Sequence, residues 1–255
     1  MSNRMHHYLD ILVVLAAKDF KVRYRNSVLG FLWSLLNPLA FIVIMTLVFS
    51  FLLRSNIPNF PAWVLTGFLI WRFFAVGTGQ GLLSIVGNPS LIRKMYIPRH
   101  IIVLSNNVAN FLGATLEFVV LLPLLIVLGV HLSIYAFVMI PVLFLEFLLV
   151  FGLSLSLSSL SVRYRDFNQL WEIAIQLGFF LSPIVYDSSL IPERFRLAYS
   201  LNPVTALIES ARSIFLMGRL PSALNMGIAL SAVMILLGLG FLTFRRLERG
   251  FAEEL

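Results

Sequence analysis

The sequence predicts an all-α integral membrane protein. It has six transmembrane helices, an N-terminal amphipathic helix at the membrane interface, and re-entrant helices before the last span. Hydrophobic residues make up 59% of the 255 residues and charged residues only 12%, whereas soluble domains average roughly 45–50% and about 25%. The mean hydropathy is +0.93. Six apolar stretches each approach the length of about 20 residues that crosses the hydrocarbon core of a bilayer.

This composition also excludes several classes of protein: a soluble globular protein, a disordered chain and a nucleic-acid-binding domain. The net charge is +7, but there are too few polar residues to form a solvated basic face for nucleic acid. The basic charge is better assigned to connecting loops and anionic lipid. The chain has no cysteine, which excludes disulfides and cysteine-ligated metals, and we expect no metal site. No cleavable apolar region follows the polar N-terminus, so we expect no signal peptide.

Residues 1–30 are predicted to form an interface helix that does not span the membrane. Their basic side chains Lys18, Lys21 and Arg25 fall on one helix face. Helices with such a basic face lie in the headgroup region of a bilayer. A different face carries the apolar side chains Tyr8, Ile11, Leu12, Leu15 and Val22.

The six spans follow in order, and only four of them carry a charge. Glu172 lies near the end of its span, whereas Arg72, Glu117 and Glu146 lie deeper. A charge at the bilayer centre costs at least about 2.5–3.5 kcal/mol, so the deeper three are expected to face the bundle interior. Glu117 and Glu146 form either a relay or substrate contact, or polar packing satisfied by Arg72 or hydroxyls. The predicted spans are 31–53, 63–86, 101–130, 133–162, 167–186 and 220–244.

Two connections are predicted to be helical. Residues 88–98 are short, amphipathic and bounded by prolines, so a push on this helix would move two spans together. Residues 187–219 are too long for a simple loop and too charged to cross, and we expect external re-entrant helices that line a passage. A folded external cap is the alternative. Within this segment Glu209 and Arg212 are spaced to pair on one helix face.

Basic residues in the connections set the expected orientation. They concentrate before the first span, in the loop 87–100, before the fifth span and in the tail after residue 244. Loops rich in Lys and Arg remain on the cytoplasmic side, so both termini are predicted to be cytoplasmic.

Nucleotide binding and catalysis find no support in the sequence. A P-loop needs Gly-Lys-Ser/Thr, and none of the three lysines, Lys18, Lys21 and Lys94, follows a glycine. The Gly77, Gly79 and Gly81 pattern lies inside a span and is interpreted as close helix packing. No histidine lies near the serines of the fourth span, so we assign no catalytic residues.

The aromatic residues allow two interpretations. The chain holds 23 Phe, 7 Tyr and 4 Trp, and many of these side chains would form interfacial belts. Alternatively, aromatic faces stack on sugar rings and would line a carbohydrate passage. The candidates for such a channel or substrate lining are Trp71, Phe73, Trp171, Phe179, Phe180, Tyr186, Phe195 and Tyr199.

Three motifs resemble those of the membrane (permease) subunit of ABC transporters that export polysaccharides, the O-antigen, capsule and teichoic-acid branch. The first is KVRYRNSVLGFLWSLLNP at residues 21–38, which enters the first span. The others are RYRDF at 163–167 and LNPVTA at 201–206. The resemblance covers essentially the whole chain and is strongest to O-antigen (Wzm-type) permeases.

The resemblance implies a homodimer with two separate ATPase subunits that bind ATP and Mg²⁺, in the bacterial cytoplasmic (inner) membrane. It implies export of a lipid-linked polysaccharide for lipopolysaccharide biosynthesis. Basic residues of the interface helix would meet lipid phosphate. These residues are Lys18, Lys21, Arg23, Tyr24 and Arg25. A coupling helix would contact the ATPase through Arg93, Lys94, Met95, Tyr96, Ile97 and Pro98.

Three other functions stay open on the sequence. An exporter of a drug or small lipid would share the architecture. An ion-coupled secondary transporter would use Glu117 and Glu146 and need no ATPase. An intramembrane enzyme ranks last, because no histidine lies mid-span beside a serine.

Overall fold

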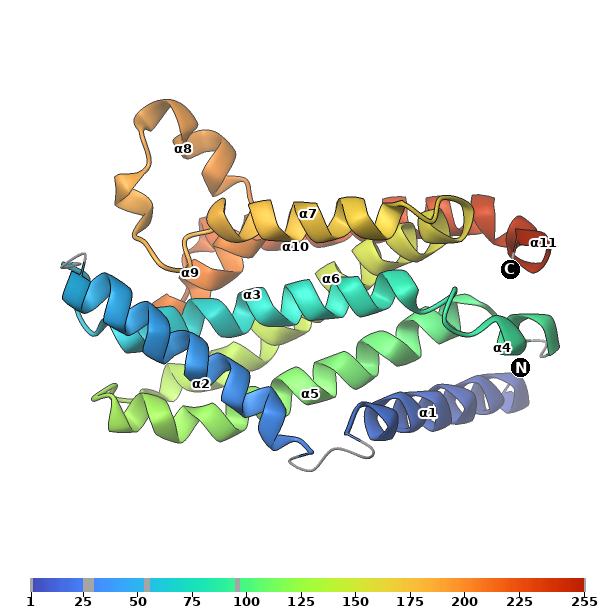
Figure 1. Cartoon of the computed structure of the whole chain (residues 1–255), viewed down its shortest axis with the longest axis horizontal. Coiled ribbons are helices and arrows are strands. Elements are labelled where there is room, and N and C mark those ends of the chain that lie inside the picture. Colours follow the sequence, from blue (N-terminus) through green and yellow to red (C-terminus); the bar gives the residue numbers. More distant parts are fainter. Residues whose placement is uncertain (1, 25–29, 53–55, 95–96, 255) are drawn as a thin grey trace.

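The computed structural model of the chain describes residues 2–24, 30–52, 56–94 and 97–254, and every regular element in these ranges is helical (Figure 1). This confirms the predicted all-α class. The elements are α1 Ser2–Tyr24, α2 Leu32–Thr46, η1 Leu47–Leu52, α3 Phe60–Leu83, α4 Pro89–Lys94, α5 His100–Val127, η2 Ile134–Val138, α6 Met139–Arg163, α7 Phe167–Phe180, η3 Ser188–Leu190, α8 Glu193–Ser200, α9 Pro203–Phe215, α10 Ala223–Leu247, η4 Glu248–Gly250 and α11 Phe251–Glu254.

Five helical segments within the described ranges are long and apolar enough to cross a membrane, so the predicted count of six is not confirmed. The difference lies in the fifth predicted span. Its helix α7 has 14 residues, about 21 Å at 1.5 Å per residue, against a hydrocarbon core of about 30 Å. Pro183 explains the early end of α7, because the residue before a proline is disfavoured in helical conformation.

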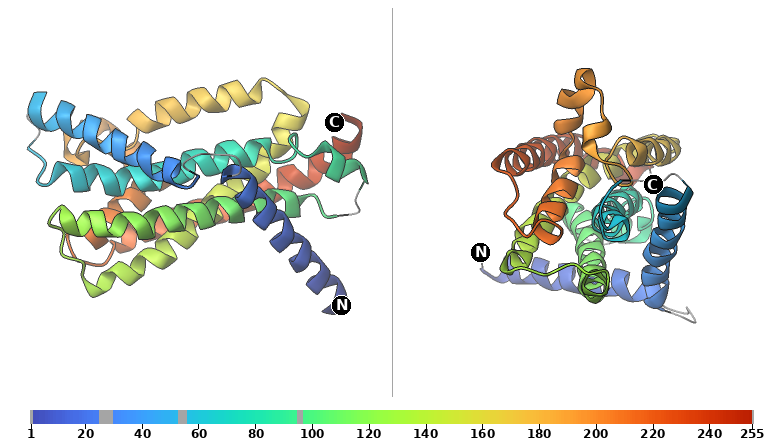
Figure 2. Two further views of the ribbon diagram at one scale, coloured as in Figure 1. Left: turned by 60° about the horizontal axis from the view of Figure 1, so that its bottom comes forward. Right: turned by 90° about the vertical axis from the view of Figure 1, so that its left-hand side faces the viewer.

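The helices are arranged so that the two ends of the bundle differ. Both termini, α4 and α11 lie at one end, and α8 and α9 lie at the other (Figure 1). Helix α1 packs against α5 and diverges from the bundle axis (Figure 2). Its packed side chains include Leu15 and Ala16, whereas Val22, predicted on the apolar face, is 57% exposed.

The predicted re-entrant segment divides into two unlike helices. Helix α8 has no buried residue and projects from the bundle (Figure 2). Helix α9 is buried at every position except Pro203 and Glu209, because it packs against α3, α6 and α10. Asn202 caps α9, its side chain accepting a hydrogen bond from the backbone N–H of Val204.

Helix α6 lies between α3 and α10, and small residues set how closely it approaches α3. A Cβ on Gly77 would stand 2.7 Å from Val150 Cγ1, and a Cβ on Gly81 would collide with the Ser154 side chain. Small residues at such positions allow membrane helices to approach closely. The predicted packing role of Gly77 and Gly81 is confirmed, whereas Gly79 faces open space.

The contact between α6 and α10 is backbone to backbone. A Cβ on Gly152 would lie 2.7 Å from the backbone nitrogen of Leu237, and a Cβ on Gly240 would collide with the Gly152 carbonyl oxygen. Backbone atoms cannot rotate away as a side chain can, so this crossing admits only glycine.

We predict that Gly240→Ala destabilises the protein by about 1–3 kcal/mol, the usual cost of overpacking. The measurement is the melting temperature of the detergent-solubilised protein. Gly238→Ala is the matched control, because Gly238 lies on the same helix and a Cβ there meets nothing within 4 Å. Equal melting temperatures for the two variants would contradict the close packing of α6 and α10.

Candidate functional site

An ion pair joins the middle of α3 to α5. Arg72 Nε donates to Glu117 Oε2 at 2.9 Å, and its Nη2 donates to Glu117 Oε1 at 3.3 Å. The two side chains are only 19% and 11% exposed. This two-point geometry satisfies both charges where solvent is scarce. The pair therefore supports the packing interpretation of Glu117 over the relay.

A cavity of about 280 Å³ with both polar and apolar lining residues opens beside this pair, and we call it the interface cavity. At its far end Arg23 of α1 donates hydrogen bonds to Gln80 of α3 and Asn110 of α5. The Arg23 guanidinium and the amides of Asn37, Gln80 and Asn110 thus face one space that suits phosphate or hydroxyl oxygens. The lining residues are Arg23, Gly30, Trp33, Ser34, Asn37, Arg72, Phe73, Val76, Gln80, Asn110, Ala114 and Glu117.

Glu146 of α6 differs from Glu117. It is 0% exposed, and neither carboxylate oxygen has a hydrogen-bond partner among the described residues. Among the described residues, the structure therefore pairs one of the two deep carboxylates and leaves the other buried without a hydrogen-bond partner.

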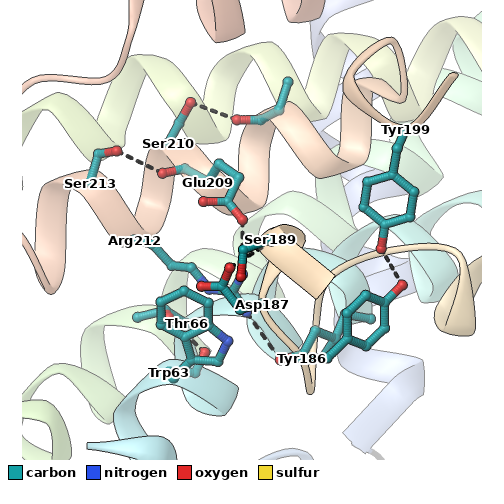
Figure 3. Close-up of polar contacts among 12 residues, drawn as sticks. Trp63, Thr66, Tyr186, Asp187, Ser189, Tyr199, Glu209, Ser210, Arg212 and Ser213 are labelled. Atoms are coloured by element: carbon teal, nitrogen blue, oxygen red, sulfur yellow. Dashed lines mark hydrogen bonds and ion pairs between the residues drawn. The ribbon is translucent and has the colours of Figure 1, made fainter. Parts of the chain in front are cut away.

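At the opposite end of the bundle, a second group of polar and aromatic side chains surrounds Arg212 (Figure 3). We call this group the outer cluster; its members are Trp63, Tyr186, Asp187, Ser189, Tyr199, Glu209 and Arg212. The Arg212 side chain is fully buried. Its Nη1 donates to Glu209 Oε1 at 3.0 Å, and its Nη2 donates to the Ile184 carbonyl at 3.1 Å. The guanidinium carbon lies 3.7 Å from the centre of the Trp63 ring, a cation–π contact. The ion pair expected from the Glu209 and Arg212 spacing is present.

Burial and hydrogen bonding shift the pKa values of this cluster. Burial raises the pKa of Glu209, which Arg212 opposes, and burial lowers the pKa of Arg212 to about 10. Arg212 therefore stays protonated at neutral pH. Hydrogen bonds from Ser189 lower the pKa of Asp187, and burial raises that of Tyr199.

Two cavities flank the segment that begins at Asp187. One, of about 470 Å³, is lined by Tyr199, Thr205 and Glu209 together with several hydroxyl groups. The other, of about 520 Å³, is lined by Trp63, Tyr186 and Leu190. Tyr199 donates a hydrogen bond to the Tyr186 hydroxyl, which donates to the Phe180 carbonyl. This end of the bundle thus combines aromatic faces with hydroxyls and carboxylates, the groups that contact sugars.

The predicted aromatic lining residues are distributed over different surroundings. Trp71 and Phe73 are buried at 6% and 3% exposure, Trp71 lies against Phe179 at 6.0 Å between ring centres, and Phe73 lines the interface cavity. Trp171 donates from Nε1 to Thr78 at 3.2 Å. Tyr186 and Tyr199 belong to the outer cluster, and the exposed rings are Phe180 and Phe195.

The predicted coupling and interface residues lie at the end that holds the termini. Arg93 is exposed on α4, and Ile97 and Pro98 are half-buried. Lys18 Nζ donates to Asn88 Oδ1 at 3.2 Å, which links α1 to the start of α4. Lys21 is exposed. Met95, Tyr96, Arg25 and the side chains of Tyr24 and Lys94 lie outside the described residues.

Sequence reasoning missed the two amide partners of Arg23. The signal available was the presence of amide side chains such as Gln80 and Asn110 inside apolar runs. In the part of the chain that the structure describes, no group of three His, Cys, Asp or Glu side chains could hold a metal ion.

Comparison with known proteins identifies the family of this chain. Residues 11–216 match the ABC-2 type transporter family model. The O-antigen export system permease protein RfbA of Klebsiella pneumoniae is 34% identical over 256 residues, which cover 100% of this chain and 98% of that protein. RfbA of Myxococcus xanthus is 34% identical over 262 residues, with 100% and 99% coverage. The capsule polysaccharide export inner-membrane protein CtrC of Neisseria meningitidis is 22% identical over 247 residues, with 96% and 93% coverage.

We predict that Glu117→Leu lowers stability by about 3–5 kcal/mol, because it leaves the Arg72 charge buried without its partner. Adding Arg72→Met should recover much of that loss. Thermal unfolding in detergent measures both effects. Glu172→Leu is the control, since Glu172 is exposed. A double variant as unstable as the sum of its single changes would show that the two residues are not coupled.

Proposed function

The chain belongs to the ABC-2 type transporter family, and on that premise we propose that it is the membrane subunit of an ATP-driven exporter of a lipid-linked polysaccharide, with O-antigen as the favoured substrate. The observation that carries the proposal is the similarity to O-antigen export permeases at 34% identity over the whole chain. The capsule export relative supports polysaccharide as the wider substrate class.

The working unit we propose is a homodimer with two ATPase subunits that carry ATP and Mg²⁺. The sequence has no P-loop glycine–lysine pair, so hydrolysis belongs on the partner. Helix α4 would receive the ATPase, and the exposure of its Arg93 at the end that also holds both termini supports this role. In the bacterial inner membrane this end faces the cytoplasm.

Substrate entry is assigned to the interface cavity. Its volume of about 280 Å³ is small beside the typical 300–1,000 Å³ of ligand sites, so it suits a headgroup and not a polymer. Arg23 faces this cavity, and one guanidinium group can bind two phosphate oxygens at once. Trp33 provides an aromatic wall for an adjacent sugar.

Substrate exit is assigned to the outer cluster. Its cavities combine Trp63, Tyr186 and Tyr199 with polar side chains beside α8 and α9. ATP-driven closure of the ATPase subunits would press on α4 and α1, shift the spans, and advance the glycan toward this end.

We predict that reversing both charges at Arg93 and Lys94 to Glu abolishes export or removes the ATPase from the complex. The physical reason is that like charges across a docking surface repel. The tagged complex is extracted gently and weighed intact by mass spectrometry, and export of labelled glycan is followed in liposomes. The unaltered complex should contain two copies of this chain and two of an ATPase.

Arg219→Glu is the matched control, because Arg219 is also exposed but follows α9. Full export by the Arg93 and Lys94 variant would exclude α4 as the coupling element. A chain that never retains an ATPase, yet transports under an ion gradient, would overturn the proposed function and favour the secondary transporter.

A further inference from the structure

One buried aromatic side chain anchors α11, the last helix that the structure describes. Phe251 is 1% exposed, as is Phe244 of α10. Their rings meet edge to face, with centres 5.5 Å apart and planes at 88°. A helix of only four residues is not stable on its own. The burial of Phe251 therefore fixes where α11 lies.

Phe251 belongs to a buried apolar cluster that reaches α4, and its ring also lies against Arg99. Helix α4 packs more closely against α11 than against any other described helix, and Ile92 of α4 belongs to the same buried cluster as Phe251. Beyond α4, the Arg99 guanidinium carbon lies 5.8 Å from the centre of the Phe251 ring, within cation–π range. Phe251 thus shares a buried cluster with Ile92, which precedes the segment 95–98, and contacts Arg99, which follows it.

The contacts continue from Phe251 into the transmembrane bundle. The short helix η4 joins α11 directly to α10. On α10, Phe241 meets His100 and Phe151 at 6.4 and 6.0 Å between ring centres. One residue earlier, Gly240 lies against the backbone of Gly152 on α6. A displacement of α4 would therefore be transmitted through packed side chains to α10 and α6.

We propose that Phe251 is a positioning residue for energy coupling: it holds α4 to α10, so that α4, α11 and α10 move as one body when the ATPase acts. This inference rests on the proposed function, in which an ATPase docks on α4. Helix α4 has only six residues, and without the Phe251 contact it would shift independently of the spans. Close-packed interiors transmit such shifts and do not absorb them.

The test uses the full complex of this chain with its ATPase, reconstituted in liposomes with its native lipid-linked glycan. The quantity measured is the amount of glycan exported per ATP hydrolysed. For Phe251→Ala we expect this ratio to fall about tenfold, a change within the usual range of coupling between sites, while the ATPase stays bound and hydrolyses ATP. Phe251→Leu keeps apolar volume and should fall less.

Phe60→Ala is the matched control for simple destabilisation. Phe60 is 3% exposed and stacks on Phe49 at 5.5 Å between ring centres, but it lies at the start of α3, near the opposite end of the bundle (Figure 1). This variant should lose thermal stability as Phe251→Ala does and keep the normal export ratio. If the export ratio fell equally in both variants, the role of Phe251 would be structural only.

A further variant covers the case in which Phe251→Ala fails to fold. Arg99→Gln removes the cation over the ring and leaves Phe251 buried, and it should lower the ratio by a smaller factor. Normal export per ATP in Arg99→Gln and in Phe251→Leu would overturn the inference. If the unaltered complex binds no ATPase, the proposed function fails instead, and the two failures are thereby distinguished.

Discussion

The close approach of α6 to α3 and α10 is the constraint on which the rest of the structure depends. Lipid tails are as apolar as the helix surfaces, so membrane helices associate through packing and polar contacts and not through the hydrophobic effect. Gly81 and Gly240 bring α3 and α10 onto α6 at distances that a side chain would forbid. This places α3 at the centre of the fold, where Trp63, Thr66 and Trp71 are buried.

Once α3 is buried, its charge must find a partner within the protein. Arg72 meets Glu117 on α5, and at the outer end Arg212 meets Glu209 and the face of Trp63. Each guanidinium contacts a carboxylate, which offsets part of the cost of removing both charges from water. Glu146 has no such partner among the described residues.

The sequence predicts the helices better than the contacts between them. Hydropathy located the spans because it depends only on local composition, and the i,i+3 spacing predicted the Glu209 and Arg212 pair for the same reason. Hydropathy overestimates the length of α7, because apolar residues continue past Pro183 whereas the helix ends before it. The hydrogen bonds from Arg23 to Gln80 and Asn110 join residues far apart in sequence, and no periodicity reports such a pairing. The burial of Phe251 was missed because the tail after residue 244 is short and charged.

Helix α3 connects the two polar sites physically. It meets the outer cluster at Trp63, the ion pair at Arg72 and the Arg23 side chain at Gln80. From Trp63 to Gln80 a helix rises about 25 Å at 1.5 Å per residue, so one rigid element reaches from the outer cluster to the far end of the interface cavity. A rigid rod that shifts at one end shifts at the other. Because α3 and α10 both pack closely against α6 at glycines, movement of α10 relative to the membrane carries α6 and α3 with it. The two polar sites contact the same rod, at Trp63 and at Gln80, so a shift of α3 moves them together.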